Sequence, residues 1–337
     1  MSSSLIRRAT LGLALSVAAS ALWALPTRYH LQDLGAGTLA AHINARGMVA
    51  GTDTSTGHHL PVIWTPEQMQ WLNDPFPGGD ALWINESGVV VGTVEEGYGS
   101  AAYWTKYGVF EDIGAAQGLM GTVIASINDK GDCIFWGAAD AESSNLLLLP
   151  KCNLSKQIFL GWDLWGAAIN GNDQVALTDK SYQDRQHAYL YSDGALTDLG
   201  MLTGYTQSIA ADLNGDAHVV GTAADAAYDQ REGFFWNGKK MRRVGTLGGE
   251  RSEANAINGH DVVVGSAQTS TGKWHAFVRD MRAVGSGPQD LGKMLDSSGK
   301  GWSLDSAVSI NKSGQIIVRG TAPRDSNPRS AVLTPLD

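Results

Sequence analysis

The feature that most constrains this chain is an asparagine that returns seven times in nearly the same setting. An Ile or Leu precedes it each time, and a β-rich run resumes just after it. Successive copies are 41, 43, 42, 44, 44 and 53 residues apart, at Asn44, Asn85, Asn128, Asn170, Asn214, Asn258 and Asn311. A period of this length leaves room for four short strands with their turns, which indicates a β-propeller blade.

Each asparagine opens a tight hairpin. In copies one, two, three and seven a glycine stands three residues later, which predicts a type I turn closed by a left-handed glycine at Gly47, Gly88, Gly131 and Gly314. In copies four, five and six the glycine directly follows the asparagine, which predicts a two-residue type II′ turn with Gly171, Gly215 and Gly259. We expect each asparagine side chain to bond the backbone of its own turn, so the seven asparagines are structural.

A third strand follows each hairpin, as in "GFFW" and "HAFV", and a fourth ends in "EDIG", "TDLG" or "QDLG" where the pattern is clearest. The chain stops after the third strand of copy seven, at "SAVLTPLD". The missing strand is found at the other end, where "YHLQDLG" (29–35) precedes the first asparagine. The sequence therefore predicts an all-β, seven-bladed β-propeller of four-stranded antiparallel blades, with the last blade closed by the N-terminal strand.

Residues 1–24 are typical of a secretory signal peptide. Arg7 and Arg8 precede an apolar run from Leu11 to Ala19, and small residues suited to signal peptidase follow. Cleavage after Ala21 and cleavage after Ala24 both fit the pattern. Residues 25–337 then form a single propeller domain of seven repeats, and we expect a periplasmic or extracellular location.

Charge and composition narrow the partners. Without Arg7 and Arg8 the chain has 23 basic residues against 34 acidic ones, a formal charge of −11, and no basic block. Nucleic acid and an anionic membrane surface are therefore not expected as partners. Nothing after Pro26 approaches the run of about 18 apolar residues that a membrane span needs, so no membrane span is expected. We also expect the protein to be a monomer. The cysteines, Cys133 and Cys152, are compatible with one disulfide or with two buried thiols.

One repeat carries a family resemblance. The stretch "TLGGERSEANAINGHDVVVGSAQTSTGKWHAFV" (246–278) contains the triplet His275, Ala276 and Phe277, and "HAY" stands at 187–189. The sequence resembles the extracellular HAF-repeat family, which is named for this triplet. Weaker copies cover the rest of the mature chain, although five of them lack the triplet. The resemblance implies an exported bacterial repeat protein and no general catalytic activity.

The triplet histidines are interpreted as structural. A ring of metal ligands would need a ligand at the same position of every copy. We assign to the position of His187 and His275 the following residues in the other five copies: Leu60, Ser100, Asn145, Glu232 and Ser330. This mixture does not fit a ring of metal ligands. Each histidine is expected to bond a neighbouring strand or loop. The acids before Leu-Gly or Ile-Gly are interpreted as turn-fixing groups, at Asp33, Asp112, Asp198 and Asp290. No metal and no cofactor are predicted.

Candidate ligand residues are sought where a regular position of the repeat is broken. Loops from the fourth strand to the next blade, and from the second strand to the third, emerge on one face, which is the default binding face. Five residues before the asparagine stand Leu39, Asp80, Val123, Trp165, Ile209, Glu253 and Ser306. Asp80 and Glu253 break this mostly apolar position, and Trp165 is oversized there.

Other aromatic and charged residues lie on the same loops. The loops from the fourth strand to the next blade add Trp162, Asp163, Glu250, Arg251, Trp302 and Asp305. The loops from the second strand to the third add Tyr98, Tyr182, Arg185, Arg231 and Trp274. Aromatic faces mixed with carboxylates and Arg suit sugar rings or a protein loop. The competing interpretation is that the tryptophans pack between blades and that the acids only keep the protein soluble.

Three functions remain. The first is a non-catalytic binding protein that recognises a protein or glycan through one face of the channel, and no catalytic residue is assigned. The second is a glycoside hydrolase or lyase, which would need two carboxylates held across a cleft, taken from Asp80, Asp163, Glu253 and Asp305. The third is a periplasmic inhibitor or structural repeat protein with a broad, flat interface.

Overall fold

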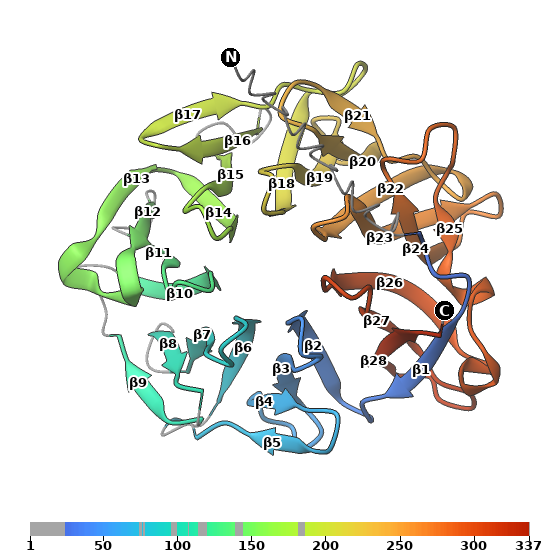
Figure 1. Cartoon of the computed structure of the whole chain (residues 1–337), viewed down its shortest axis with the longest axis horizontal. Helices are drawn as coiled ribbons and strands as arrows, with labels where there is room; N and C mark the ends of the chain where they lie inside the picture. Colours follow the sequence, from blue (N-terminus) through green and yellow to red (C-terminus); the bar gives the residue numbers. More distant parts are fainter. Residues whose placement is uncertain are drawn as a thin grey trace, which may run out of the picture.

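The computed structural model describes residues 24–336 except 74, 75, 77, 96–99, 107, 114–119, 139–143 and 181–185. Its strands form seven four-stranded antiparallel sheets arranged in a ring (Figure 1). The predicted seven-bladed β-propeller is confirmed. Residues 1–23 of the predicted signal peptide lie outside the described residues, as do Tyr98, Tyr182 and Arg185.

The blades are numbered in the order of their asparagines. Blade 1 is formed by β2 (Thr38–Ile43), β3 (Val49–Asp53), β4 (Leu60–Trp64) and β5 (Met69–Trp71). Blade 2 is formed by β6 (Gly79–Ile84), β7 (Val90–Val94), β8 (Ser100–Trp104) and β9 (Phe110–Asp112). Blade 3 is formed by β10 (Met120–Ile127), β11 (Cys133–Ala138), β12 (Ser144–Leu149) and β13 (Ile158–Trp162). Blade 4 is formed by β14 (Leu164–Ile169), β15 (Val175–Asp179), β16 (His187–Ser192) and β17 (Ala195–Asp198). Blade 5 is formed by β18 (Gln207–Leu213), β19 (Val219–Ala224), β20 (Arg231–Trp236) and β21 (Met241–Arg243). Blade 6 is formed by β22 (Gly248–Ile257), β23 (Val262–Thr269), β24 (Trp274–Asp280) and β25 (Gln289–Asp290).

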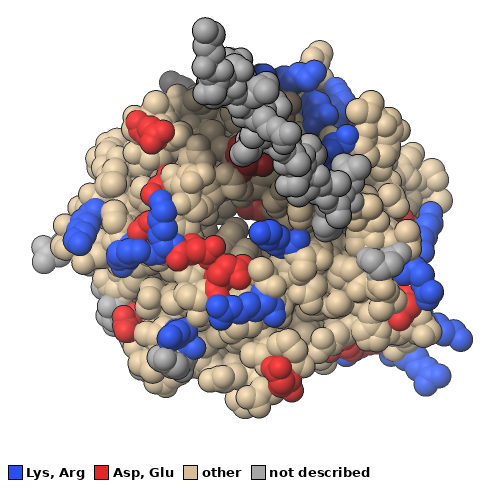
Figure 2. Space-filling view, in the orientation of Figure 1, with Lys and Arg blue, Asp and Glu red and all other residues tan. Residues whose placement is uncertain are grey.

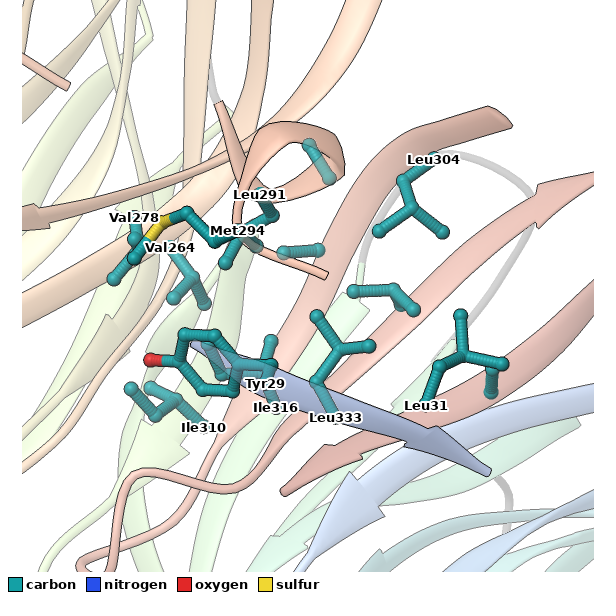
Figure 3. Close-up of a cluster of buried hydrophobic side chains, with 14 of the residues drawn as sticks. Tyr29, Leu31, Val264, Val278, Leu291, Met294, Leu304, Ile310, Ile316 and Leu333 are labelled. Atoms are coloured by element: carbon teal, nitrogen blue, oxygen red, sulfur yellow. The ribbon is translucent and has the colours of Figure 1, made fainter. Parts of the chain in front are cut away.

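Blade 7 combines the two ends of the described chain. It is formed by β26 (Ser303–Ile310), β27 (Ile316–Thr321), β28 (Pro328–Pro335) and β1 (Tyr29–Asp33). The side chains of Tyr29 and Leu31 share one core with Ile316 and Leu333, and Tyr29 lies near Val264 of blade 6 (Figure 3). The predicted closure by the N-terminal strand is confirmed, and it removes an open sheet edge.

Helical structure is minor in the described part of the chain. It consists of four short 3-10 segments, η1 (Pro150–Cys152), η2 (Leu154–Lys156), η3 (Leu291–Lys293) and η4 (Ser297–Gly299). Within those described ranges, no helix has the length and apolar character to cross a membrane.

The asparagine turns behave as expected. In every blade the side-chain oxygen of the asparagine accepts the backbone N–H of the residue four positions later, for example Val89 N–H to Asn85 Oδ1 at 3.0 Å. The prediction that each asparagine bonds its own turn is confirmed.

The asparagine amides also join the blades. The Nδ2 of Asn85 donates to the backbone carbonyl of Asn128 at 3.1 Å, and the same bond recurs from each blade to the next. Asn311 donates to the Asn44 carbonyl at 2.8 Å and closes the circle. We call this closed set of seven hydrogen bonds the asparagine ring.

The predicted type II′ turns in copies four, five and six were wrong. Gly171, Gly215 and Gly259 are not in the left-handed region. That conformation instead falls three residues after the asparagine, as in the other blades, at Asp173 (φ 60°), Ala217 (φ 59°) and Asp261 (φ 54°). The asparagine side chain bonds the fourth residue in all seven blades and so imposes one turn geometry, which aspartate tolerates and alanine adopts at a cost of about 1–2 kcal/mol.

The triplet histidines bond the fourth strand of their own blade, as expected. His187 Nδ1 lies 3.0 Å from Asp198 Oδ2, and His275 Nδ1 lies 2.9 Å from Asp290 Oδ2. The other carboxylate oxygen of each aspartate accepts the N–H of the glycine two residues later. The interpretation of these aspartates as turn-fixing groups is confirmed for Asp198 and Asp290, and also for Asp33, which accepts from Gly35.

The same cross-strand slot is occupied in two blades that lack the triplet. Blade 5 pairs Glu232 with Arg243. In blade 7 the register places Arg329 opposite Gly320, so Arg329 and not Ser330 occupies the triplet position, which corrects the assignment from the sequence by one residue. Arg329 Nη1 pairs with Asp33 Oδ2 at 3.2 Å. In these four blades the slot holds a hydrogen-bonding or oppositely charged pair, and histidine with aspartate is one form of it.

The two cysteines form a disulfide. It joins Cys133 of β11 to Cys152 of η1 and closes a loop with a sequence separation of 19 within blade 3. Of the two alternatives left open by the sequence, the structure has the bridge.

Candidate binding site at the channel mouth

The seven residues that stand five before each asparagine occupy one equivalent place in the ring. Each is paired in the register with the residue eight after the asparagine of its own blade. We call these seven pairs the channel mouth: Leu39 and Thr52, Asp80 and Thr93, Val123 and Trp136, Trp165 and Thr178, Ile209 and Thr222, Glu253 and Ser266, Ser306 and Arg319. They lie on the first and second strands of each blade, and the first strands are innermost in the ring (Figure 1).

Two mouth residues were missed in the sequence. Five of the seven partners on the second strand are Ser or Thr, but blade 3 has Trp136 and blade 7 has Arg319. The signal was present as a Gly-Thr or Gly-Ser dipeptide in copies one, two, five and six, which becomes "FWG" in copy three and "VRG" in copy seven. A search for broken positions on the second strand as well as the first would have found both residues.

Glu253 of blade 6 lies in a mixed cluster with blade 5. Its carboxylate accepts the Nε–H of Arg231. The guanidinium carbon of Arg231 lies 5.0 Å from the ring centre of Trp274 and 5.2 Å from that of Tyr228. The structure thus brings together three predicted residues, Arg231, Glu253 and Trp274, and a cation held on two aromatic faces beside a carboxylate is a polar, shaped surface.

Asp80 of blade 2 faces blade 1. Its Oδ1 accepts the hydroxyl of Thr52 at 2.8 Å and lies 3.0 Å from His59 Nδ1. The carboxylate is half exposed, with 39% of its side-chain surface accessible. It is therefore held in place by two partners while an edge stays open to solvent.

Trp165 forms an aromatic pocket with blade 3. The pocket has a volume of about 250 Å³ and is lined by Val123, Ala125, Trp136, Trp165 and Gly166. Trp165 is 49% exposed although it is a large apolar side chain. An exposed tryptophan beside an apolar pocket is typical of a binding surface.

Two cations of this region have no carboxylate partner among the described residues. The Lys180 ammonium lies over the ring of Trp165, and burial lowers its pKa to about 8. In blade 7 the Arg319 Nη2 donates to the Ala40 carbonyl at 3.4 Å, and the surrounding protein lowers the pKa of Arg319. Both groups are available to an anion, since neither is neutralised by a described acid.

The remaining candidates are more dispersed. Trp302 is half-buried and packs against the core that contains Leu291 and Leu304, as the packing interpretation proposes. The carboxylate of Asp305 accepts the Ser303 hydroxyl at 3.2 Å. The ligand role proposed for these two residues stays a prediction.

Trp162 and Asp163 lie at the junction of blades 3 and 4. Trp162 is 57% exposed and meets Phe159 edge-on, with ring centres 5.3 Å apart. The carboxylate of Asp163 accepts the N–H of Ser144 at 3.3 Å. In β22, Glu250 is exposed and Arg251 is half-exposed, and both precede the mouth position.

Charges of both signs surround the centre of the ring. The face drawn in Figure 2 is hollowed at its centre, and acidic and basic side chains are interspersed around the hollow. In the part of the chain that the structure describes, no group of three or more His, Cys, Asp or Glu residues could hold a metal ion.

Comparison with known proteins supports the fold. No protein-family model matches the sequence, and no curated protein matches it, so the HAF-repeat resemblance stays a prediction. An acylaminoacyl peptidase of Pyrococcus horikoshii is similar in structure, with 11% identity and a TM-score of 0.56 over 89% of this chain and 52% of the peptidase. A prolyl endopeptidase has 10% identity and a TM-score of 0.55 over 88% of this chain and 47% of the endopeptidase. A puromycin-hydrolysing peptidase of Mycobacterium tuberculosis has 12% identity and a TM-score of 0.53 over 91% of this chain and 52% of the peptidase.

This chain therefore spans about half the length of each of these peptidases. At such low sequence identity the likeness shows the propeller fold alone. Function has to be argued from the residues of the site, because one fold carries many functions.

Proposed function

We propose that this chain is an exported, non-catalytic binding propeller that recognises a protein or a glycan at its channel mouth. The observation that carries the proposal is that the mouth breaks its own repeat in five blades. The residues at these places are Asp80, Trp136, Trp165, Glu253 and Arg319. A propeller needs only the regular apolar and Ser/Thr positions to hold its blades together, so aromatic and charged replacements at one rim favour recognition.

The placement of the carboxylates favours binding over hydrolysis. Glycosidases hold two carboxyl groups about 5–10 Å apart on either side of one bond. Here Asp80 belongs to blade 2 and is held by Thr52 and His59, whereas Glu253 belongs to blade 6 and is paired with Arg231. Neither is bonded to the other, and each already has a structural or recognition partner.

Export is part of the same proposal. The signal peptide pattern at 1–24 is supported by the disulfide between Cys133 and Cys152, because such bridges persist in oxidising compartments such as the periplasm. Membership of the extracellular HAF-repeat family is proposed on the repeat at 246–278 with its triplet and on the second triplet at 187–189.

A thermal-shift screen of residues 25–337 tests the binding role. Peptides, glycans and cell-wall fragments are tested on the unmodified protein, on Trp165→Ala and Glu253→Gln, and on the control Lys312→Gln, which alters the asparagine turn of blade 7. A ligand at about 100 times its Kd should raise Tm by roughly 5 °C. The shift should be lost in at least one mouth variant and kept in the control. A ligand that stabilises all four proteins equally would place recognition elsewhere.

Expression of the whole chain in a bacterium tests export. We expect a periplasmic or secreted product whose mass shows cleavage after Ala21 or Ala24. A variant in which the apolar run carries Leu13→Arg should stay uncleaved in the cytoplasm. Uncleaved, cytoplasmic wild-type protein would refute the export half of the proposal and leave the binding half to be judged by the thermal screen.

A further inference from the structure

The pocket between blades 3 and 4 is unlike the rest of the channel mouth because it is apolar. Its walls come from Val123 and Ala125 of β10, Trp136 of β11, and Trp165 and Gly166 of β14. Trp136 stands where five other blades have Ser or Thr, and Trp165 is the largest side chain at its own position. Both departures from the repeat therefore converge on one pocket.

The size of the pocket limits what enters it. An apolar cavity of about 150 Å³ accommodates a benzene molecule, whereas whole drug-sized ligands occupy about 300–1,000 Å³. A volume of about 250 Å³ thus takes one ring with a short substituent. An oligosaccharide would have to leave all but one of its rings outside.

The lining also selects against a sugar ring. Three of the five lining residues are aliphatic or glycine, and the other two are the tryptophans Trp136 and Trp165. A sugar placed here would bury hydroxyl groups that find few acceptors or donors, which is unfavourable. An aromatic ring loses nothing of this kind and gains offset or edge-to-face contact with the two indoles.

A positive charge stands beside the pocket. The Lys180 ammonium lies over the ring of Trp165, and no carboxylate of the described residues pairs with it. The acids of the mouth are committed elsewhere, Glu253 to Arg231 and Asp80 to Thr52 and His59. A carboxylate on the ligand would supply the missing partner through a charge-assisted hydrogen bond.

We infer that this pocket binds an aromatic ring that carries a carboxylate on a short linker. The inference rests on the proposed function and deepens it, because it names the chemistry that one part of the mouth recognises. Two sources share this chemistry, a free aromatic acid and a peptide that ends in an aromatic residue with a free C-terminus.

The test uses 3-phenylpropionate, its neutral amide 3-phenylpropionamide, and methyl β-glucoside. Binding to residues 25–337 is followed by the indole N–H signals in nitrogen-15 NMR spectra, which are assigned with Trp136→Phe and Trp165→Phe. We expect 3-phenylpropionate to shift the signals of Trp136 and Trp165 and the amide to bind about tenfold or more weakly. The glucoside should leave both signals in place.

A charge-neutralising pair of variants makes the test specific. Lys180→Gln should bind the acid and the amide equally weakly, while Lys312→Gln, which removes a similar charge far along the chain at an asparagine turn, should keep the preference for the acid. Melting temperatures establish that both variants are folded. Equal binding of acid and amide by the wild type, glucoside binding at the same two signals, no binding of 3-phenylpropionate, or loss of preference in Lys312→Gln would each overturn the inference.

Peptides separate the two sources of the ligand. If Ala-Ala-Phe with a free C-terminus binds at least as tightly as 3-phenylpropionate and its C-terminal amide does not, the pocket accepts peptide ends; if only the free acid binds, it accepts small aromatic acids. Failure here differs from failure of the proposed function. A thermal-screen ligand that depends on Glu253 but not on Lys180 or Trp165 would uphold the binding propeller and reject this pocket chemistry.

Discussion

Backbone conformation explains which single residues of the asparagine turn can change. The left-handed position lies three residues after each asparagine, so glycine is useful there and unnecessary directly after the asparagine. Gly88 has φ 86°, and a Cβ atom at this position would meet Met48 and Lys106 at ordinary contact distances. Gly171 has no positive φ, and a Cβ atom there would meet nothing within 4 Å.

We therefore expect opposite results from two matched substitutions. Gly88→Ala should lower the free energy of unfolding by about 1–2 kcal/mol because alanine is strained in the left-handed region. Gly171→Ala should leave it unchanged or raise it by up to about 1 kcal/mol, since alanine reduces the entropy of the unfolded chain. Urea denaturation measures both. If Gly171→Ala lost as much stability as Gly88→Ala, this result would favour the type II′ turn that was predicted at Gly171.

His42 provides a pH-dependent prediction at the same scale. Its ring stacks on Trp83 with ring centres 3.9 Å apart, and its Nδ1 lies 3.0 Å from the Ile84 carbonyl of blade 2. Burial lowers the pKa of His42 to about 3. Between about pH 6.5 and 3 the unfolded chain binds a proton at this histidine that the folded chain does not, so the stability it contributes at neutral pH is lost as the pH falls.

Replacement by a side chain that does not titrate should reduce this acid sensitivity. His42→Gln can keep a donor toward the Ile84 carbonyl, and its stability should fall less steeply between pH 6.5 and 4.5, by up to about 1.4 kcal/mol per pH unit. His58→Gln is the control, because His58 is exposed. Urea denaturation at several pH values gives the slopes. Parallel slopes for wild type and His42→Gln would show that His42 is protonated in the folded state.

At the scale of the structural element, the asparagine turns are the parts that join one blade to the next. Each asparagine holds its own hairpin through Oδ1 and the following blade through Nδ2. These two roles need an acceptor and a donor on one short side chain, which asparagine alone supplies at this length. The repeat therefore preserves the residue even where the neighbouring glycine moves.

Asn85→Asp separates the two roles. The carboxylate can still accept from Val89 N–H, but at neutral pH it has no hydrogen to donate to the Asn128 carbonyl. We expect a loss of about 1–3 kcal/mol in the free energy of unfolding at pH 7. Because burial beside a carbonyl raises the pKa of such an aspartate, protonation should recover part of the difference from wild type as the pH falls. A variant as stable as wild type at pH 7 would mean that the inter-blade bond contributes nothing.

At the scale of the whole molecule, the ring is closed by noncovalent contacts between distant parts of the sequence. Tyr29 is fully buried and Leu31 is 5% exposed, and both pack into a core shared by blades 6 and 7. The β1 strand also pairs with β28 over its full length. Closure thus couples the N-terminal strand to the stability of the whole propeller.

Tyr29→Ala should therefore destabilise the whole protein. Removal of a large buried aromatic ring costs about 3–5 kcal/mol in a well-packed core. Trp71→Ala in β5 is the comparison, because Trp71 is 57% exposed and its loss should change stability by less than about 1 kcal/mol. Thermal unfolding followed by circular dichroism distinguishes them. Equal effects in the two variants would show that β1 is not part of the cooperative unit.

The candidate site could be predicted in part. The positions of Asp80, Trp165 and Glu253 follow from the repeat, because equivalent residues of a repeat occupy equivalent places in the ring. The packing of Trp302 could not be predicted, since a loop tryptophan that packs on a core has the same sequence signature as an exposed one. Trp136 and Arg319 carried a signal on the second strand, and Lys180 carried none.

The sequence by itself determined the number of blades, the four strands of each and the closing strand, because hydrophobic alternation and turn residues are local and recur with the period of the repeat. Only the tertiary structure decided which residues meet between blades. The contacts of Asn85 with Asn128 and of Arg231 with Glu253, and the pocket that Trp136 shares with Trp165, depend on how neighbouring sheets are placed around the ring. The physical reason is that strand periodicity sets the direction of a side chain within its own sheet, whereas the packing of one sheet on the next sets what that side chain touches.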